Sequence, residues 1–326
     1  MGVPEAVFIT AEPGSPAPSM IVGGLTVLER RLLEAQRRGV KRAIVAVDAP
    51  LPERAFTIDI ERAPGAEVPA GAEVVRADEL AGIRIATRAD ARRAEWAHLT
   101  SLPKSFQGPV DALINRHVSL RLTRVLAKTP ITPNMVTVVA LLIGLGAAGL
   151  LVWAAPAAII VAGVLMELQS IVDSCDGELA RLRFQFSKLG QWLDNVADDI
   201  TDSALMFGLG VAAGGRTWFL LGCAAAAARV FTQLVLYWQV RRAGGDFWNF
   251  RWWFESDVGS LDEVYDRSSP MTWVRSLGRR DVYLFLWGVA CVVGLPVAAA
   301  AYAVGIAGVF TIMTVLHLAL SRRSST

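Results

Sequence analysis

Acidic side chains of one kind gather in the middle of the chain, at or near the ends of two apolar segments. They are Asp173, Asp176, Asp194, Asp198, Asp199 and Asp202. A carboxylate is costly to bury in a membrane, so such a group indicates a functional site by default. Asp173 and Asp176 are three residues apart and Asp194 and Asp198 are four apart, so each pair shares one helix face. If the two helices are neighbours, four carboxylates converge on one cavity.

Four carboxylates in one cavity repel one another, and hard divalent cations are the natural compensation. Oxygen ligands suit Mg²⁺, Mn²⁺ or Ca²⁺, whereas zinc sites use histidine or cysteine. The histidines are dispersed, at His98, His117 and His317, and form no ligand set. The pattern therefore predicts a divalent cation site. A cation transporter is one alternative, because acidic groups in membrane helices often line ion paths.

Small residues and one arginine lie between the two acidic pairs. Gly177, Ala180 and Gly190 let a ligand or a neighbouring helix approach the backbone closely. Arg181 can hold a phosphate through its planar fork of donors. Metal ions, small residues and an arginine together suit the binding of a pyrophosphate.

The elements that position these residues are long apolar runs. Of the 326 residues, 53% are hydrophobic and 19% are charged, and the mean hydropathy is +0.42. This composition argues against disorder and against a typical soluble enzyme. A net charge of +2 is too small to indicate a nucleic-acid partner. Six membrane spans are predicted, at Asn134–Trp153, Ala157–Val172, Asp194–Ala213, Thr217–Val240, Asp281–Leu295 and Val297–Leu320.

The positive charges predict how these spans are oriented. Lys and Arg residues follow the second, fourth and sixth spans, whereas the other connections carry almost no charge. The positive-inside rule then places both termini and the loops that adjoin the acidic site on the cytosolic side. We expect the protein to lie in a cell inner membrane. Residues 111–129, DALINRHVSLRLTRVLAKT, form an amphipathic basic segment suited to the membrane surface.

The amino-terminal part has the pattern of a small α/β domain. Residues 6–10 are strand-like, residues 25–40 have helical spacing that ends at Gly39, and residues 41–48 form a second apolar strand. This order is typical of a parallel crossover. Residues 89–102 predict a further helix, and residues 49–88 give no clear pattern. We predict a mainly α protein with a truncated, Rossmann-like cytosolic domain (1–100), a juxtamembrane segment (101–132) and a six-helix membrane domain (133–326).

The acidic region resembles the CDP-alcohol phosphotransferase family. It fits the signature D-x2-D-G-x2-A-R-x8-G-x3-D-x3-D at all eight fixed positions, from Asp173 to Asp198. The resemblance covers roughly residues 104–323. Two further segments, KTPITPNMVT (128–137) and GRRDVYLFL (278–286), resemble the branch that contains di-inositol-phosphate-phosphate synthase.

The resemblance implies a reaction and roles for the signature residues. Such enzymes move a phosphoalcohol group from a CDP-alcohol donor to an acceptor hydroxyl and release CMP, in phospholipid or inositol-phosphate synthesis. Asp173, Asp176 and Asp194 would be the main ligands of one or two Mg²⁺ or Mn²⁺ ions. Asp198 would be shared between the second ion and proton abstraction from the acceptor. The nucleotide pocket would be shaped by Gly177, Ala180, Arg181 and Gly190, with Asn134 and Thr137 as further candidates. The family also implies a homodimer.

Several alternatives stay open. A donor such as CDP-diacylglycerol with a polar acceptor alcohol would use the same chemistry. Helix capping and packing explain Asn134 and Thr137 almost as well as nucleotide binding. Asp199 and Asp202 fall outside the signature and would line the cavity. Arg229 would pair with a carboxylate such as Asp202 or Glu167, or bind an acceptor phosphate.

The amino-terminal part resembles the opening of a sugar-phosphate nucleotidyltransferase, in AVFITAEPG (6–14) and in residues 21–48. It departs from that family because no Gly-x-Gly-Thr-Arg loop follows the first strand. Roughly a hundred residues are also too few for the complete domain. We therefore expect a shortened, inactive remnant that serves in packing or dimerisation.

Overall fold

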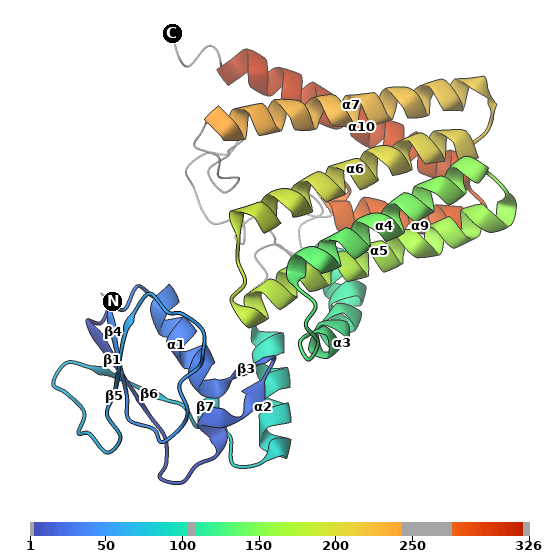
Figure 1. Cartoon of the computed structure of the whole chain (residues 1–326). Helices are drawn as coiled ribbons and strands as arrows, with labels where there is room; N and C mark the ends of the chain where they lie inside the picture. The colour runs from blue at the N-terminus through green and yellow to red at the C-terminus, as the bar shows by residue number, and fades with distance from the viewer. Residues whose placement is uncertain (1–2, 103–107, 243–275, 322–326) are drawn as a thin grey trace. The chain divides into compact units, whose positions relative to one another are not determined.

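The computed structural model describes residues 3–102, 108–242 and 276–321 (Figure 1). Within these residues the contacts divide the chain into two compact units. The first unit contains the amino-terminal residues to Pro103 together with two short later segments, Leu120–Ile131 and Gly177–Phe186. The second unit contains the remaining residues. Several of the arginines used to predict the orientation, including Arg322 and Arg323, lie outside the described residues.

The first unit is built on a four-stranded parallel sheet. Its order is β5 (Asp59–Arg62), β4 (Arg42–Val45), β1 (Ala6–Thr10) and β6 (Glu73–Arg76). Helix α1 (Val27–Arg37) connects β1 to β4, and Gly39 ends it with a φ of +80°. Its buried Leu28 and Leu32 pack against Val7 of β1. The predicted strand, helix and parallel crossover are confirmed, although a Rossmann-like domain goes further than this small sheet shows.

The stretch that gave no clear pattern contains short strands. Besides β5 and β6, it holds the β7 (Glu79–Leu80) and β8 (Ile83–Arg84) hairpin. A second hairpin pairs β2 (Ile21–Val22) with β3 (Leu25–Thr26), after the short helix η1 (Ala17–Ser19). The predicted helix is present as α2 (Arg88–Ser101), and a reciprocal cap between Thr87 and Asp90 fixes its start.

Two arginines bind the later segments into the first unit. Arg183 donates to the carbonyls of Ile131 at 2.7 Å and Ala127 at 2.8 Å, and also to those of Leu126 and Thr129. Arg30, which is fully buried, donates to the carbonyls of Leu182 and Val22, each at 2.8 Å. Burial lowers the pKa of Arg30 to about 10, so the guanidinium keeps its charge near neutral pH. The C-terminal end of helix α5, which carries Asp173 and Asp176, is therefore held by hydrogen bonds to other parts of this unit.

The second unit is helical (Figure 1). Its long helices are α4 (Pro133–Trp153), α5 (Pro156–Arg183), α6 (Lys188–Ala212), α7 (Gly215–Arg242), α9 (Arg280–Val292) and α10 (Pro296–Ser321). The predicted juxtamembrane segment forms a π-helical turn, η2 (Asp111–Asn115), followed by α3 (Arg116–Leu126). Helix α5 belongs to the second unit only up to Asp176, and α3 only up to Ser119; the rest of each helix belongs to the first unit.

Among the described residues, fewer helices than the six predicted spans are long and apolar enough to cross a membrane. Each predicted span coincides with a helix, but four helices, α4, α5, α7 and α10, are long and apolar enough to cross a membrane. Helix α6 carries the second group of aspartates, and α9 has 13 residues. A window of apolar residues identifies neither of them, because one contains too many charges and the other is too short. The six-span count is therefore not confirmed.

Small residues let these helices approach one another closely. A Cβ atom added to Gly144 of α4 would lie 2.4 Å from the Thr201 side chain of α6. Gly163 of α5 meets the carbonyl of Gly288 of α9 in the same way. A core that includes Met166, Leu205 and the fully buried Trp287 lies among these helices. The two acidic helices are therefore positioned by backbone contact with their neighbours.

The contact between α6 and α7 gives a stability prediction. A Cβ atom on Gly210 would lie 2.6 Å from the Cα atom of Gly222 and 2.7 Å from the carbonyl oxygen of Trp218. Backbone atoms cannot move aside cheaply, so we expect Gly210→Val to destabilise the protein by about 1–3 kcal/mol. Thermal unfolding of the purified protein measures the change. In Gly149→Ala the added methyl group meets nothing within 4 Å, and this control should keep the wild-type midpoint. Equal midpoints for the two variants would contradict the prediction.

Candidate metal centre

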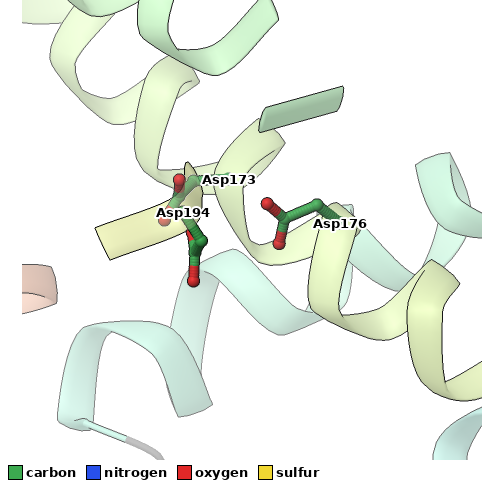
Figure 2. Close-up of side chains that lie close together, drawn as sticks. All are labelled: Asp173, Asp176 and Asp194. Atoms are coloured by element: carbon green, nitrogen blue, oxygen red, sulfur yellow. The ribbon is translucent and has the colours of Figure 1, made fainter. Parts of the chain in front are cut away.

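Three of the predicted ligands come together in the second unit (Figure 2). Asp173 and Asp176 lie one turn apart on α5, and Asp194 lies in the second turn of α6. One carboxylate oxygen from each lies within 4.8 Å of the others. Asp176 is 8% exposed, and the other two are half-buried. Oxygen ligands at this separation can share one hard divalent cation.

Asp198, the fourth predicted ligand, lies one turn after Asp194 on α6 and is not part of this group of three. Its Oδ1 atom lies 2.8 Å from Nη1 of Arg280. The same Nη1 atom lies 3.0 Å from Asp173 Oδ2. Arg280 therefore bridges the carboxylates of Asp173 and Asp198. This shared arginine connects Asp198 to the group of three.

Arg280 is the functional candidate that the sequence did not single out. It is the first residue of α9, and its segment GRRDVYLFL was noted only as a family resemblance. The available signal was an arginine at the start of an apolar run, which needs a partner when it faces a helix bundle. That partner could not be named before α9 was placed beside α5.

A second polar network adjoins the first. Asp202 is fully buried and accepts hydrogen bonds from Arg229 at 2.9 Å and from Arg280 Nε at 3.2 Å. Arg229 also donates to Asp199 at 3.1 Å, and Asp199 accepts from the hydroxyl of Tyr237. The expected pairing of Arg229 with Asp202 is confirmed.

The charges of the two networks test whether metal ions fit here. When all are ionised, the six aspartates contribute six negative charges, and Arg229 and Arg280 contribute two positive charges. Four negative charges are left, which two divalent cations would balance. In addition, Asp198 lies beside Asp173 under the same Arg280 guanidinium, so its carboxylate oxygens are within reach of the group of three. The donor set and its charge therefore fit divalent metal ions.

Thr137 and Asn134 support the cluster from the start of α4. The hydroxyl of Thr137 donates to Asp176 Oδ2 at 2.5 Å, which fixes the orientation of that carboxylate. Asn134 Oδ1 lies 2.9 Å from the position that a Cβ atom on Gly190 would take. Ser187 Oγ lies equally close to that position and accepts a hydrogen bond from the Gly190 amide as the cap of α6. Glycine at position 190 therefore leaves room for two polar side chains.

The remaining signature residues lie in the last turns of α5. A Cβ atom on Gly177 would lie 3.3 Å from Nη1 of Arg181, so the guanidinium folds back over this glycine. Ala180 and Arg181 follow Asp176 by about one turn on the same helix. The short side chains at positions 177 and 180 thus leave space beside the arginine.

Comparison with known proteins agrees with the signature. Residues 130–253 match the family model described as CDP-alcohol phosphatidyltransferase. The chain is 34% identical over 192 residues to the bifunctional IPC transferase and DIPP synthase of Rubrobacter xylanophilus, which covers 58% of this chain and 42% of that protein. It is 36% identical over 107 residues to the protein of the same name from Thermococcus kodakarensis, which covers 33% of this chain and 24% of that one.

A shorter relative matches the same region. The archaetidylinositol phosphate synthase of Pyrococcus horikoshii is 35% identical over 95 residues, or 29% of this chain and 48% of that protein. The chain thus spans less than half the length of each of these curated relatives. The matches confirm the family resemblance and its branch.

Proposed function

We propose that this chain transfers a phosphoalcohol group from a CDP-alcohol to an acceptor hydroxyl. The premise is that residues 130–253 match the CDP-alcohol phosphatidyltransferase family. The observation that carries the proposal is the convergence of Asp173, Asp176 and Asp194, three fixed positions of the signature. The names of the relatives favour inositol phosphate compounds or inositol lipids among the substrates. A donor of the CDP-diacylglycerol type is the runner-up.

The reaction is an in-line displacement at phosphorus. The acceptor oxygen forms a bond to the phosphorus that carries the donor alcohol, and the bond from that phosphorus to CMP breaks. Asp198 accepts the acceptor proton, because it adjoins the three ligands and a placed carboxylate can act as a base. Two Mg²⁺ or Mn²⁺ ions held by Asp173, Asp176, Asp194 and Asp198 would supply charge neutralisation at the pyrophosphate and the leaving CMP.

The other signature residues position the donor. Arg181 holds a phosphate of the CDP group through its planar fork, and Gly177 and Ala180 leave room for the nucleotide. Gly190 keeps the start of α6 open beside Asn134. Thr137 orients Asp176 and acts through that ligand.

The proposed membrane arrangement completes the predicted architecture. Helices α6 and α9 join the four apolar helices in a six-helix domain, because their glycines pack directly on α7 and α5. The active site and both termini face the cytosol of an inner membrane, where CDP-alcohols are dissolved or enter from the lipid. The amino-terminal unit lacks the nucleotidyltransferase loop and makes no CDP-alcohol. The protein acts as a homodimer.

The proposal predicts strict metal dependence of transfer. The purified full chain in lipid nanodiscs is incubated with CDP-inositol or CDP-diacylglycerol and a panel of acceptor alcohols. CMP release and product mass are followed. We expect CMP with Mg²⁺ or Mn²⁺, loss of at least a hundredfold in EDTA because the ions provide most of the leaving-group stabilisation, and recovery when Mg²⁺ is restored. Metal-dependent cation flux without CMP from any donor would sink the proposal in favour of a transporter.

A further inference from the structure

A basic groove of about 710 Å³ lies within the first unit, apart from the acidic cluster. One face of α2, the connection from β1 to β2 and the residue Lys128 after α3 line it. Three of its lining residues are cations, Arg88, Arg92 and Lys128. A volume of this size lies in the range of small-ligand sites, roughly 300–1,000 Å³.

The groove has an excess of positive charge among the residues that the structure describes. Its one acid, Glu95, is 5% exposed and already has partners for both oxygens. Oε2 accepts from Arg124 Nε at 2.6 Å, and Oε1 accepts from the Gly23 amide at 3.2 Å. In the parts of the chain that the structure describes, no ion pair involves the side chains of the three lining cations. They are therefore available to an anion.

Fixed contacts hold the walls of the groove together. Arg88, Arg92 and Glu95 recur at helical spacing on one face of α2. The ion pair between Glu95 and Arg124 joins this face to the end of α3. The segment that contains Lys128 is held by Arg183, whose donors bind carbonyls on both sides of it. The three cations are thus brought together by the fold of this unit.

Two observations favour a lipid as the ligand. Lys128 precedes Pro133, the start of the first helix long enough to cross a membrane, by five residues. Even fully extended, this connection reaches roughly 17 Å at most. Ile21, an apolar residue in the lining, is 71% exposed. A single exposed isoleucine is common, but next to three cations it offers an apolar contact for an acyl chain beside a headgroup.

The lining does not suit a nucleotide. None of the described residues that line the groove is aromatic, Asn or Gln, which are the side chains that stack on bases or read their edges. The donors are cationic and suit a phosphate group.

We propose that this groove binds the phosphate headgroup of an anionic phospholipid at the membrane surface, with Arg88, Arg92 and Lys128 as the phosphate-binding residues. The basis is the charge, shape and chain position of the groove, so the proposal does not rest on the transferase function.

Binding of a short-chain lipid to the purified full chain tests the proposal. The probe is dioctanoyl phosphatidylglycerol in a neutral detergent, without any CDP-alcohol, and binding is followed by native mass spectrometry. The variant is R88Q/R92Q, in which both side chains are exposed, so folding should be retained. Each basic residue near a membrane surface adds about 1 kcal/mol to anionic lipid binding, so we expect roughly 25-fold weaker binding. Arg93→Gln is the matched control, because Arg93 lies on the same helix but outside the groove lining.

The outcomes are distinct. Saturable binding that is weakened in R88Q/R92Q, retained in Arg93→Gln and absent with dioctanoyl phosphatidylcholine supports the proposal. Unchanged binding in R88Q/R92Q, or no binding by the wild-type protein, overturns it. Inorganic phosphate that competes at the same concentration as the lipid also overturns it, because the site would then be one for a soluble anion. Loss of CMP release in the separate transfer assay would leave these lipid results unaffected.

Discussion

Asp198→Asn is expected to abolish transfer while the protein still binds its CDP donor. The change keeps the size of the side chain but removes the group that accepts the proton from the acceptor hydroxyl. Loss of a general base costs about 10²–10⁴ in rate. Asp173, Asp176 and Asp194 keep their oxygens within 4.8 Å of one another, so donor and metal binding should weaken far less than the rate. CMP release gives the rate, and calorimetric titration with a CDP-alcohol in Mg²⁺ gives the affinity.

Asp199→Asn is the matched comparison on the same helix. Asp199 is outside the signature, and its carboxylate pairs with Arg229 at 3.1 Å. We expect this variant to keep most of the transfer rate, because the neighbouring Asp202 still binds Arg229 at 2.9 Å. Normal turnover by Asp198→Asn would remove this residue from the base role. Equal losses of rate in the two variants would mean that the network as a whole, and no single carboxylate, is required.

Arg183→Ala should destabilise the first unit strongly. This side chain is 9% exposed and donates to four carbonyls in residues 126–131. Hydrogen bonds from a charged group contribute roughly 1.5–3 kcal/mol each when counted alone, and carbonyls left buried without a donor add a further cost. Because such values are not additive, we expect a loss of about 3 kcal/mol in all. Denaturant unfolding of the purified protein, followed by far-UV circular dichroism, measures it.

Two further variants make this prediction specific. Arg183→Lys keeps the charge but cannot reach four carbonyls with one ammonium group, so it should recover only part of the loss. Arg62→Ala removes an exposed arginine whose one ion pair among the described residues, with Asp48, is 3.3 Å long. It should leave stability unchanged within about 0.5 kcal/mol. An Arg183→Ala protein as stable as Arg62→Ala would show that these hydrogen bonds do not hold the unit together.

The regular elements could be read from the sequence wherever one physical signal was dominant. Apolar periodicity and the terminator Gly39 predicted the first helix, and the flanking apolar runs predicted strands β1 and β4 in parallel. The secondary structure of residues 49–88 could not be predicted because strands such as β5 and β8 have only two to four residues. That is too few for the alternation of apolar and polar residues to be visible. Their pairing depends on neighbours that are distant in the sequence.

The acidic site was predictable in its residues but not in its arrangement. Spacing on two helices predicted four converging carboxylates, and the structure brings three of them together. Asp198 lies next to Arg280, which is distant in the sequence and whose partners depend on how α9 packs. The six-span count could not be confirmed by hydropathy, for two physical reasons. Acidic residues in α6 and the shortness of α9 remove the hydropathy signal although both helices lie among the others.

The position of Asp202 has a consequence for how this protein is assembled in the cell. Its carboxylate forms ion pairs with both Arg229 and Arg280, so the chain itself neutralises the charge of this part of the acidic cluster. The helices that carry these groups can then associate before the proposed ions bind. Under the proposed function, membrane insertion and metal binding would be separate steps, and a cell short of magnesium should accumulate inserted but inactive protein that recovers once the ion returns.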